Sequence, residues 1–358
     1  MNKKAHKIAA IDIGTNTMLM LIAEVEESLL LQLREENQNA AGLSAFSRIR
    51  AETRILEDIH SIARLGEGVD KAGAISQPAL LRVLDIAQSY RDKCRAYNVQ
   101  TITAVTTSAV RDASNRAEVL RALSDALGAE TRCISGDEEA RLSYLGTSET
   151  SEICTVVDIG GGSVEYVTGV SDNITRRKSL QMGAVRLHER YFKGLPPDEA
   201  SLAAARAEIR RQLALLEEES LLATSFGEKR GDKLLQNNVT QKTTVQDGES
   251  DYGYILGVGG TFTTLAAIDL GLQEHDSERV HLHRTSAARI NEIVRYLCSS
   301  PLPELLKNPA IHPKRADILP AGALILEETL RYFNANHCTA SVKGLRYGVL
   351  YDALRTNA

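Results

Sequence analysis

Several features that would assign a chain to a familiar class are missing from this sequence. Its five cysteines (Cys94, Cys133, Cys154, Cys298 and Cys338) form no Cys-x-x-Cys pair, which argues against a disulfide framework or a zinc site and favours reduced thiols in a cytoplasm. No uncharged apolar run approaches the length of a membrane span. The N-terminus begins like a signal peptide, but Asp12 interrupts the apolar run early. The sequence therefore predicts a cytoplasmic protein with no membrane partner.

Positive charge and nucleophilic motifs are also scarce. The formal net charge is −5, which argues against a dedicated nucleic-acid surface. No serine lies in a Gly-x-Ser-x-Gly motif, so covalent hydrolase chemistry has no support. What remains is a chain of 358 residues, 43% hydrophobic and 25% charged. This composition is ordinary for a globular protein, and the length suffices for two domains.

The most informative stretch runs from Ile153 to Glu165. It begins as a short β-branched strand that ends at Asp158, passes through Gly160 to Ser163, and resumes as a second strand. Backbone N–H groups of such a glycine turn can bind phosphate, and Asp158 and Glu165 at its rim can hold a hard cation. Alone, the motif is equally compatible with a plain glycine-rich hairpin with acidic ends.

A second copy of this motif lies near the N-terminus. In residues 7–22, Asp12 corresponds to Asp158, Gly14 to Gly160 and Thr17 to Ser163. The offset is 158 − 12 = 146 residues, about the length of one domain. The pair predicts an internal duplication, with the ligand bound between the two halves.

Strands alternate with helices along the rest of the chain, which predicts an α/β fold with mixed sheets. We expect a strand at Leu29–Leu33, a polar loop from Asn37 to Glu52 and a helix at 76–97 capped by Ser76. Residues 224–252 are polar and almost without apolar side chains, which is typical of a surface loop or a disordered insertion. A strand, glycine turn and helix at 254–264 form a third anion site.

Seven motifs, in order along nearly the whole chain, resemble the exopolyphosphatase/guanosine pentaphosphate phosphohydrolase (Ppx/GppA) family. They are Asp12-Ile-Gly-Thr-Asn-Thr17, Arg64-Leu-Gly-Glu-Gly-Val69, Thr107-Ser-Ala-Val-Arg-Asp112, Ser135-Gly-Asp-Glu-Glu-Ala-Arg141, Asp158-Ile-Gly-Gly-Gly-Ser-Val-Glu165, Gly257-Val-Gly-Gly-Thr261 and Gly344-Leu-Arg-Tyr-Gly348. The chain stops at Ala358, so it resembles the short, two-domain form of the family.

The resemblance implies two ribonuclease-H-like domains of the actin/Hsp70/sugar-kinase type with a ligand cleft between them. We expect domain I at residues 1–136, with a closing helix near 345–356 packed back on it, and domain II at 137–344 with the polar insertion at 224–252. The implied substrate is inorganic polyphosphate or guanosine pentaphosphate, with no nucleic acid as partner. A homodimer is left open.

Residues of three turns are candidates to bind the phosphates. They are Thr15, Asn16 and Thr17, then Gly160, Gly161, Gly162 and Ser163, and finally Gly259, Gly260 and Thr261. Arg111 can offer a planar fork of donors to a phosphoryl group. The alternative for Arg111 is a surface ion pair with a neighbour such as Asp112.

The expected cofactor is Mg²⁺, with Mn²⁺ as an alternative. Asp158 and Glu165 would hold the ion directly or through water, with Asp12 assisting, because Mg²⁺ takes few carboxylates and keeps much of its hydration. The resemblance also implies that Glu139 activates the attacking water. Without it, Glu138 and Glu139 are better explained as acidic residues that favour a helix N-terminus.

The expected function is Mg²⁺-dependent release of orthophosphate from the end of polyphosphate or of the 5′ γ-phosphate from guanosine pentaphosphate. Two other functions stay open. A sugar or carboxylate kinase could use the same fold, although the Glu139 motif favours water as the acceptor. A non-catalytic nucleotide-binding module rests on the shared fold alone.

Overall fold

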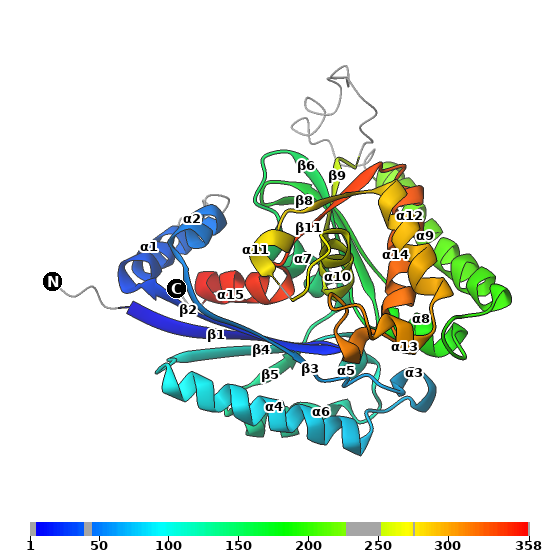
Figure 1. The fold of residues 1–358 in the computed structure, drawn as a ribbon. Coiled ribbons are helices and arrows are strands. Elements are labelled where there is room, and N and C mark those ends of the chain that lie inside the picture. Colours follow the sequence, from blue (N-terminus) through cyan, green and yellow to red (C-terminus); the bar gives the residue numbers. More distant parts are fainter. Residues whose placement is uncertain (1–4, 39–44, 227–251, 275, 357–358) are drawn as a thin grey trace.

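The computed structural model describes residues 5–38, 45–226, 252–274 and 276–356. These form two mixed β-sheets with helices packed on their faces (Figure 1). The predicted α/β fold is therefore confirmed. The predicted insertion lies mainly in residues 227–251, outside the described residues.

The first sheet has five strands in the order β3-β2-β1-β4-β5. Strands β1, β2 and β3 form an antiparallel meander, and β4 and β5 continue from β1 in parallel. Their bounds are β1 Ala5–Ile13, β2 Thr17–Glu26, β3 Arg54–Ile62, β4 Thr101–Thr106 and β5 Thr131–Cys133. The β1–β2 connection is the first predicted hairpin.

The second sheet has six strands in the order β10-β11-β9-β6-β7-β8. Here β6, β7 and β8 form the antiparallel meander, and β9 and β11 continue from β6 in parallel. The bounds are β6 Ile153–Ile159, β7 Val164–Val170, β8 Asn173–Leu180, β9 Tyr254–Val258, β10 Arg284–Ser286 and β11 His337–Ala340. Without β10, the second sheet repeats the topology of the first, as the duplicated motif predicts.

The predicted strand at Leu29–Leu33 is wrong, because these residues lie in helix α1 (Glu27–Gln38). Leu29 and Leu33 are each 1% exposed whereas Leu31 is 58% exposed, so burial recurs every four residues, as in a helix. The predicted polar loop is also wrong at its end, where α2 (Ala45–Glu52) forms. Both helices are inserted between the paired strands β2 and β3.

Helices on the other face of the first sheet agree better with the predictions from the sequence. Helix α4 (Gln77–Ala96) begins where predicted, and the Ser76 hydroxyl accepts a hydrogen bond from the Ala79 amide. It packs beside α6 (Arg116–Leu127) under the sheet (Figure 1). Two short helices, α3 (Val69–Ala72) and α5 (Ser108–Asp112), follow β3 and β4.

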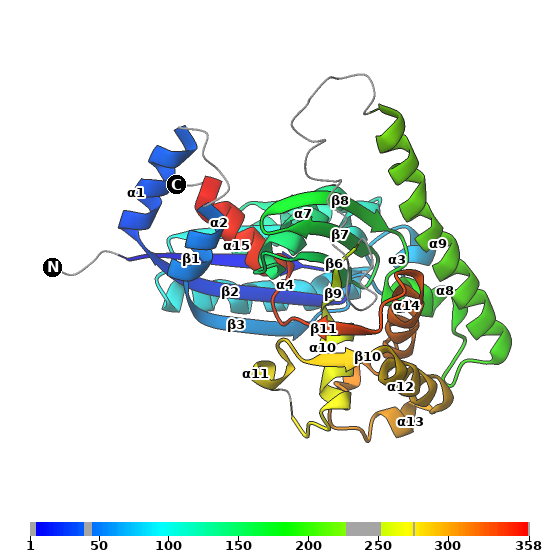
Figure 2. The same ribbon diagram turned by 90° about the horizontal axis from the view of Figure 1, so that it is seen from above.

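The second sheet is covered mainly by helices from the later part of the chain (Figure 2). Helices α8 and α9 pack beside α14, which also contacts α10 and α12. The bounds of the helices are α8 Ala184–Tyr191, α9 Glu199–Phe226, α10 Gly260–Asp269, α11 Ser277–Val280, α12 Ala287–Ser299, α13 Leu302–Leu305 and α14 Leu319–Tyr332, with a 3₁₀ turn at Pro313–Arg315.

Two helices cross between the sheets. Helix α7 (Gly136–Thr147) leads into the second sheet, and the closing helix α15 (Leu345–Thr356) returns to pack against β1 and α7. Their backbones touch: a Cβ on Gly146 would lie 2.2 Å from the Gly344 carbonyl oxygen, and one on Gly348 would lie 1.8 Å from that of Leu142. Glycine is required at both positions.

Strand alternation decides which side chains face these crossing helices. In β1, Ala9 and Ile11 belong to the core around α4 and α6, whereas Ile8 and Ala10 belong to the core shared with α7 and α15. Cys154 and Val156 of β6 also belong to that shared core. The period of two therefore places Asp12 and Asp158, the next residues in these two series, at the edge of the shared core.

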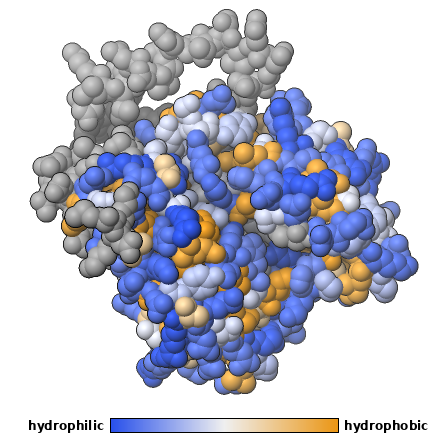
Figure 3. Space-filling model, turned by 60° about the vertical axis from the view of Figure 1, so that its left-hand side comes forward, coloured by the Kyte–Doolittle hydropathy of each residue, from blue (hydrophilic) through white to orange (hydrophobic). Residues whose placement is uncertain are grey.

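One face of the molecule is mainly hydrophilic. Figure 3 shows the side of the molecule that carries α1 and α2, where hydrophilic residues cover most of the coloured face and apolar residues form small separate spots. Among the residues that the structure describes, no helix is long and apolar enough to cross a membrane. The division into domains at residue 136 stays a prediction.

Candidate active site

The two predicted hairpins have the same turn. The Gly14 amide donates to the Thr17 carbonyl at 2.9 Å, and the Gly160 amide donates to the Ser163 carbonyl at 3.1 Å. Asp12 lies two residues before the first turn and Asp158 two residues before the second. The duplication predicted from the sequence is thus present in the backbone as well.

The two turns pack directly against each other. A Cβ on Gly161 would lie 2.8 Å from Cβ of Thr15, and one on Gly162 would lie 2.4 Å from Oγ of Ser108. The cavity between them, lined by Thr15, Ser108, Gly161 and Gly162 among others, has a volume of about 20 Å³. This space accommodates about one water molecule, so the two turns are closed on each other at this point.

Ion pairs across the mouth of the cleft accompany this closure. Arg186 of α8 donates to Asp70 of α3 at 2.9 Å and to Asp112 of α5 at 2.5 Å. Arg64, which precedes α3, donates to Asp317 at 2.8 Å. Asp112 therefore pairs with Arg186. Arg111, for which a surface pair with Asp112 was the alternative, has a different partner.

Four predicted carboxylates converge where the hairpins meet. Burial, together with the charges of Glu139 and Asp158, raises the pKa of Asp12 to about 8. Burial also raises the pKa of Asp158 and, with the charges of Glu139 and Asp158, raises that of Glu165 well above its usual value. Buried carboxylates that raise one another's pKa favour a cation nearby.

Glu139, at the start of α7, belongs to the same group. Burial raises its pKa to about 7, although Arg111 opposes the rise. Nη1 of Arg111 donates to Oε2 of Glu139 at 3.0 Å and to the Ile134 carbonyl at 3.0 Å. The neighbouring Glu138 instead faces Arg132 at the surface, so the two acidic residues of the motif differ in their surroundings.

Hydrogen bonds fix two of the carboxylates. Oγ of Ser143 on α7 donates to Oδ2 of Asp158 at 2.6 Å, and Oγ of Ser179 donates to Oε1 of Glu165 at 2.7 Å. By contrast, several buried polar atoms in this region have no hydrogen-bond partner within the described part of the chain: Oδ1 of Asp12, Oδ1 of Asn16, Oγ of Ser108 and Nη2 of Arg111. Unsatisfied buried groups of this kind are expected where a ligand binds.

The residues fit a magnesium ion that is bound partly by substrate. Within the described residues, no three His, Cys, Asp or Glu side chains are arranged to hold a metal ion by themselves. Mg²⁺ commonly takes only one or two carboxylates and completes its shell with water and phosphate oxygens. The free Oδ1 of Asp12 and the buried pair Asp158 and Glu165 are suitable donors.

The carbonyl groups of the second turn are tied to the start of α8. The carbonyl of Gly160 accepts from Ala184, that of Gly161 from Val185, and that of Gly162 from Nε of Arg186 at 2.8 Å. The first turn is anchored differently, because the Asn16 carbonyl accepts from Ala63 and Arg64. Both turns are thus fixed by hydrogen bonds to their backbone carbonyl groups.

The third turn lies beside Asp158. A Cβ on Gly259, whose φ is +90°, would lie 3.2 Å from Oδ1 of Asp158. Gly260 begins α10, where free backbone N–H groups favour an anion. The Thr261 side chain, in contrast, faces α14: a Cβ on Gly322 would lie 2.4 Å from its Oγ1. The structure thus places the backbone of this turn, rather than the Thr261 hydroxyl, near the cleft.

Two arginines near the site have no counterpart among the residues predicted from the sequence. The guanidinium of Arg315 covers Gly260 so closely that a Cβ there would lie 1.2 Å from Nη1, and burial lowers its pKa to about 10. Arg346 on α15 is 4% exposed, donates to both carboxylate oxygens of Asp58 at 2.9 and 2.8 Å, and its charge opposes the rise of the pKa of Asp12 and Asp158.

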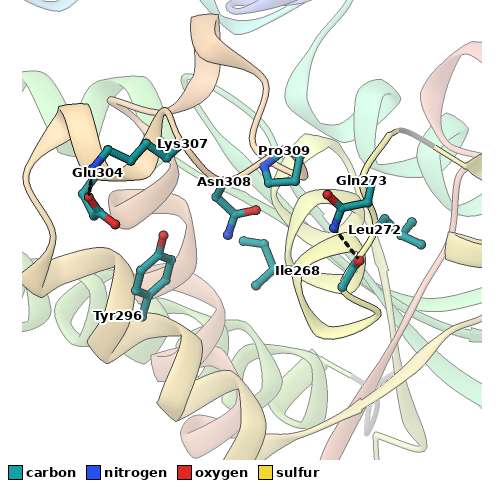
Figure 4. Close-up of a pocket in the computed structure, with 9 residues that line it drawn as sticks. Ile268, Leu272, Gln273, Tyr296, Glu304, Lys307, Asn308 and Pro309 are labelled. Carbon is teal, nitrogen blue, oxygen red and sulfur yellow. Dashed lines mark hydrogen bonds and ion pairs between the residues drawn. The ribbon is translucent and has the colours of Figure 1, made fainter.

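Two cavities with larger volumes than the cleft lie elsewhere. One, of about 310 Å³, lies at the end of α10 beside α12 and α13 (Figure 4). Its charged side chains, Glu304 and Lys307, neutralise each other at 2.7 Å. It therefore lacks the converging charges of the hairpin cleft.

Comparison with known proteins identifies the family of this chain. The model of the Ppx/GppA phosphatase family matches residues 46–357. Exopolyphosphatase 2 of Mycobacterium tuberculosis is 31% identical over 337 residues, which cover 91% of this chain and 90% of that protein. A bifunctional 3-dehydroquinate synthase/phosphatase of Fusobacterium nucleatum is 28% identical over 97% of this chain, but this chain spans only 46% of that longer protein.

A solved structure supports the same assignment. The crystal structure of an exopolyphosphatase-like protein has a TM-score of 0.79 and 26% sequence identity, and the match covers 98% of this chain and 100% of that one. The resemblance inferred from the seven motifs is therefore confirmed. The chain belongs to the Ppx/GppA phosphatase family.

Proposed function

We propose that this protein releases orthophosphate from the end of inorganic polyphosphate by attack of a water molecule activated by Glu139. The observation that carries the proposal is the convergence of Asp12, Glu139, Asp158 and Glu165 between two phosphate-binding turns. The extent of the match to an exopolyphosphatase supports polyphosphate as substrate. The 5′ γ-phosphate of guanosine pentaphosphate has the same terminal chemistry and is the second candidate substrate.

Binding would begin when the turns separate. Backbone N–H groups of Gly160–Ser163, of Thr15–Thr17 and of Gly259–Thr261 would hold phosphate oxygens, as glycine turns and helix N-termini do. Arg315, beside Gly260, would add a buried positive charge to the third turn. Nη2 of Arg111, which has no partner within the described residues, would bind the terminal phosphoryl group, because a guanidinium offers parallel donors to phosphate oxygens.

Mg²⁺, when bound, would neutralise charge on the phosphate oxygens. Asp158 and Glu165 would hold it, with Oδ1 of Asp12 as a further donor. The hydrogen bonds from Ser143 and Ser179 orient these two carboxylates. Mn²⁺ has similar preferences for oxygen donors and is the expected substitute.

Glu139 is suited to remove the proton from the attacking water. A general base works best when its pKa lies near the operating pH, and burial raises the pKa of Glu139 to about 7. The hydrogen bond from Arg111 orients the carboxylate. In phosphoryl transfer the protein forms few covalent bonds with the substrate, so positioning and charge neutralisation supply most of the catalysis.

The test is phosphate release from medium-chain polyphosphate and guanosine pentaphosphate, measured in parallel for wild type and Glu139→Gln with Mg²⁺. We expect the variant to lose roughly 100- to 10,000-fold in turnover, the usual contribution of a general base, while it still binds polyphosphate. Glu138→Gln is the matched control, because it changes the adjacent carboxyl group, which faces Arg132 instead, and should retain activity. Near-normal turnover in Glu139→Gln would assign the base elsewhere.

A further inference from the structure

Two arginines on one face of α8 hold a single carboxylate at the mouth of the cleft. Nε and Nη2 of Arg190 donate to Oδ2 and Oδ1 of Asp70 at 2.5 and 2.6 Å, and Nη1 of Arg186 donates to Oδ1 at 2.9 Å. The two arginines are four residues apart on the helix, so their side chains are neighbours. Guanidinium groups that converge in this way can bind either a carboxylate or a phosphate.

The arginine pair lies next to the second phosphate-binding turn. Nε of Arg186 donates to the Gly162 carbonyl at 2.8 Å. Arg186 and Asp70 line the same cavity as Gly161 and Gly162 of the turn. Arg190 lies one helical turn further along α8, and its side chain is 40% exposed against 15% for Arg186. A phosphate chain that leaves the turn through this cavity therefore meets Arg186 first and Arg190 next.

The carboxylates that neutralise this pair come from the other half of the molecule. Asp70 lies on α3, which follows β3 of the first sheet, and Asp112 of α5 accepts from Nη2 of Arg186 at 2.5 Å. Helix α8 follows β8 of the second sheet and lies beside α3 in both ribbon views (Figures 1 and 2). Separation of the two halves would therefore take both carboxylates away from the arginines.

The arginine face of α8 would then carry an excess of positive charge. Glu189 is the one carboxylate on α8, and it accepts from the Gly68 amide at 2.9 Å. Glu208 of α9, whose charge also acts on Arg190, accepts hydrogen bonds from Arg211 at 2.8 and 2.7 Å. Two arginines beside one carboxylate favour the binding of an anion from solution.

Asp70 is itself an anion that occupies this position. The hydrogen bond from Arg190, together with the charge of Arg186, holds the pKa of Asp70 below its ordinary value, although burial opposes this. The carboxylate is therefore charged at neutral pH and competes with any other anion for the two arginines. The competition ends when the halves separate.

We propose that Arg186 and Arg190 form a subsite for an inner phosphate of a polyphosphate chain, and that Asp70 occupies this subsite while the cleft is closed. The inference rests on the proposed function, because it adds a second contact for the same substrate. A chain whose terminal phosphate lies on the Gly160–Ser163 turn displaces Asp70 and binds its two arginines. A single orthophosphate on the turn leaves Asp70 in place, so the subsite favours the chain over the released product.

The test measures binding rather than turnover. Medium-chain polyphosphate is titrated calorimetrically, with Mg²⁺, into Glu139→Gln protein, which we expect to bind the chain without hydrolysing it. The two variants added to this parent are Asp70→Asn and Arg190→Gln. The control for the first is Glu67→Gln, because Glu67 pairs with Arg82 at 2.8 Å within the same half of the molecule.

The control for Arg190→Gln is Arg211→Gln. It removes the same charge from α9, where the guanidinium is paired with Glu208. The double variant Asp70→Asn with Arg190→Gln completes a cycle that shows whether the two residues act on binding through each other.

We expect Asp70→Asn to bind polyphosphate about tenfold more tightly than the parent, because the internal competitor is lost. Arg190→Gln should bind about tenfold more weakly, because the chain loses a charge-assisted contact while Asp70 keeps its hydrogen bond from Arg186. Glu67→Gln and Arg211→Gln should bind within about twofold of the parent. In the Arg190→Gln background, Asp70→Asn should tighten binding by less than it does alone.

Three results would overturn the proposal. The first is an Asp70→Asn affinity no higher than that of the parent. The second is an equal gain in Glu67→Gln, which would show only a general repulsion between acidic residues and the chain. The third is the same gain from Asp70→Asn with and without Arg190. A parent that binds no polyphosphate would overturn the proposed substrate as well, whereas binding that is equal in all variants would overturn this inference alone.

Discussion

The two hairpins share a backbone but differ in chemistry. In the second hairpin Asp158 lies directly across from Glu165, whereas in the first the residue across from Asp12 is Leu19. Serine hydroxyls hold both carboxylates of the second hairpin, whereas Oδ1 of Asp12 has no partner within the described residues. The two turns are thus alike in backbone, but the second, with its paired carboxylates, is the main candidate for the metal ion.

The turns also differ in size in a complementary way. Thr15 and Asn16 of the first turn have side chains, and the equivalent positions of the second are Gly161 and Gly162. Thr15 occupies the space that a side chain on Gly161 would need. The two turns can therefore approach closely only because the second has glycines at these positions.

The largest expected effect is on turnover, and it should differ between substitutions of the two aspartates. Asp158→Asn should lower turnover on polyphosphate by roughly 100- to 1,000-fold, because the charge stabilisation supplied by a metal ion is worth several kcal/mol. Asp12→Asn should lower it less and raise the Mg²⁺ concentration needed for half-maximal rate. Steady-state assays across a Mg²⁺ series measure both effects. Equal losses in the two variants would contradict unequal roles for the two hairpins.

The next effect concerns the size of the turns. Gly162→Ala places a Cβ 2.4 Å from Oγ of Ser108, so the closed cleft cannot form without a shift, and such overpacking typically costs about 1–3 kcal/mol. We expect about a tenfold loss of turnover and a larger radius of gyration by small-angle X-ray scattering.

Asn16→Ala, at the equivalent position of the first turn, should leave the radius of gyration unchanged. Ser108→Gly combined with Gly162→Ala removes the clash and should restore the closed form. A compact single Gly162→Ala variant would show that closure does not depend on this contact.

The smallest effect is a pH dependence of stability in the metal-free protein. The pKa of Asp12 is about 8 in the folded protein, against 3.8 for an exposed aspartate, so its protonation stabilises the fold fully below pH 3.8, and this stabilisation is lost as pH rises through 8. The free energy of unfolding of wild type should fall between pH 6.5 and pH 8 by roughly 1–2 kcal/mol more than that of Asp12→Asn, at 1.36 kcal/mol per pKa unit.

Urea denaturation at the two pH values measures this difference, with Glu138→Gln as a control that should behave like wild type. Saturating Mg²⁺ should reduce it, because metal binding favours the deprotonated carboxylates. Identical pH dependence in wild type and Asp12→Asn would show that Asp12 is not held protonated in the fold.

Much of this arrangement could be predicted from local sequence. Both hairpins follow from an apolar strand, an Asp-Ile-Gly turn and a second strand, and the repeat predicted their equivalence. The prediction for residues 29–33 was wrong because a run of leucines is compatible with both a strand and a helix. Only the burial of Leu29 and Leu33, four residues apart, shows that the segment is a helix. Short apolar runs are ambiguous in this way.

The residues that surround the site were harder to predict from the sequence. Arg315 contacts Gly260 across 315 − 260 = 55 residues, from a 3₁₀ turn with no local pattern. Arg346 lay in a predicted helix and a quoted motif, but nothing local indicated that it would be buried against Asp58, 288 residues away. Such contacts depend on how the two sheets pack, which neither periodicity nor turn residues specify.

The most direct test of the central claim is a crystal structure of Glu139→Gln with medium-chain polyphosphate and Mg²⁺. We predict a terminal phosphate in contact with both the Thr15–Thr17 and the Gly160–Ser163 turns, with the ion on Asp158. A terminal phosphate bound to one hairpin alone, or outside the cleft, would contradict it.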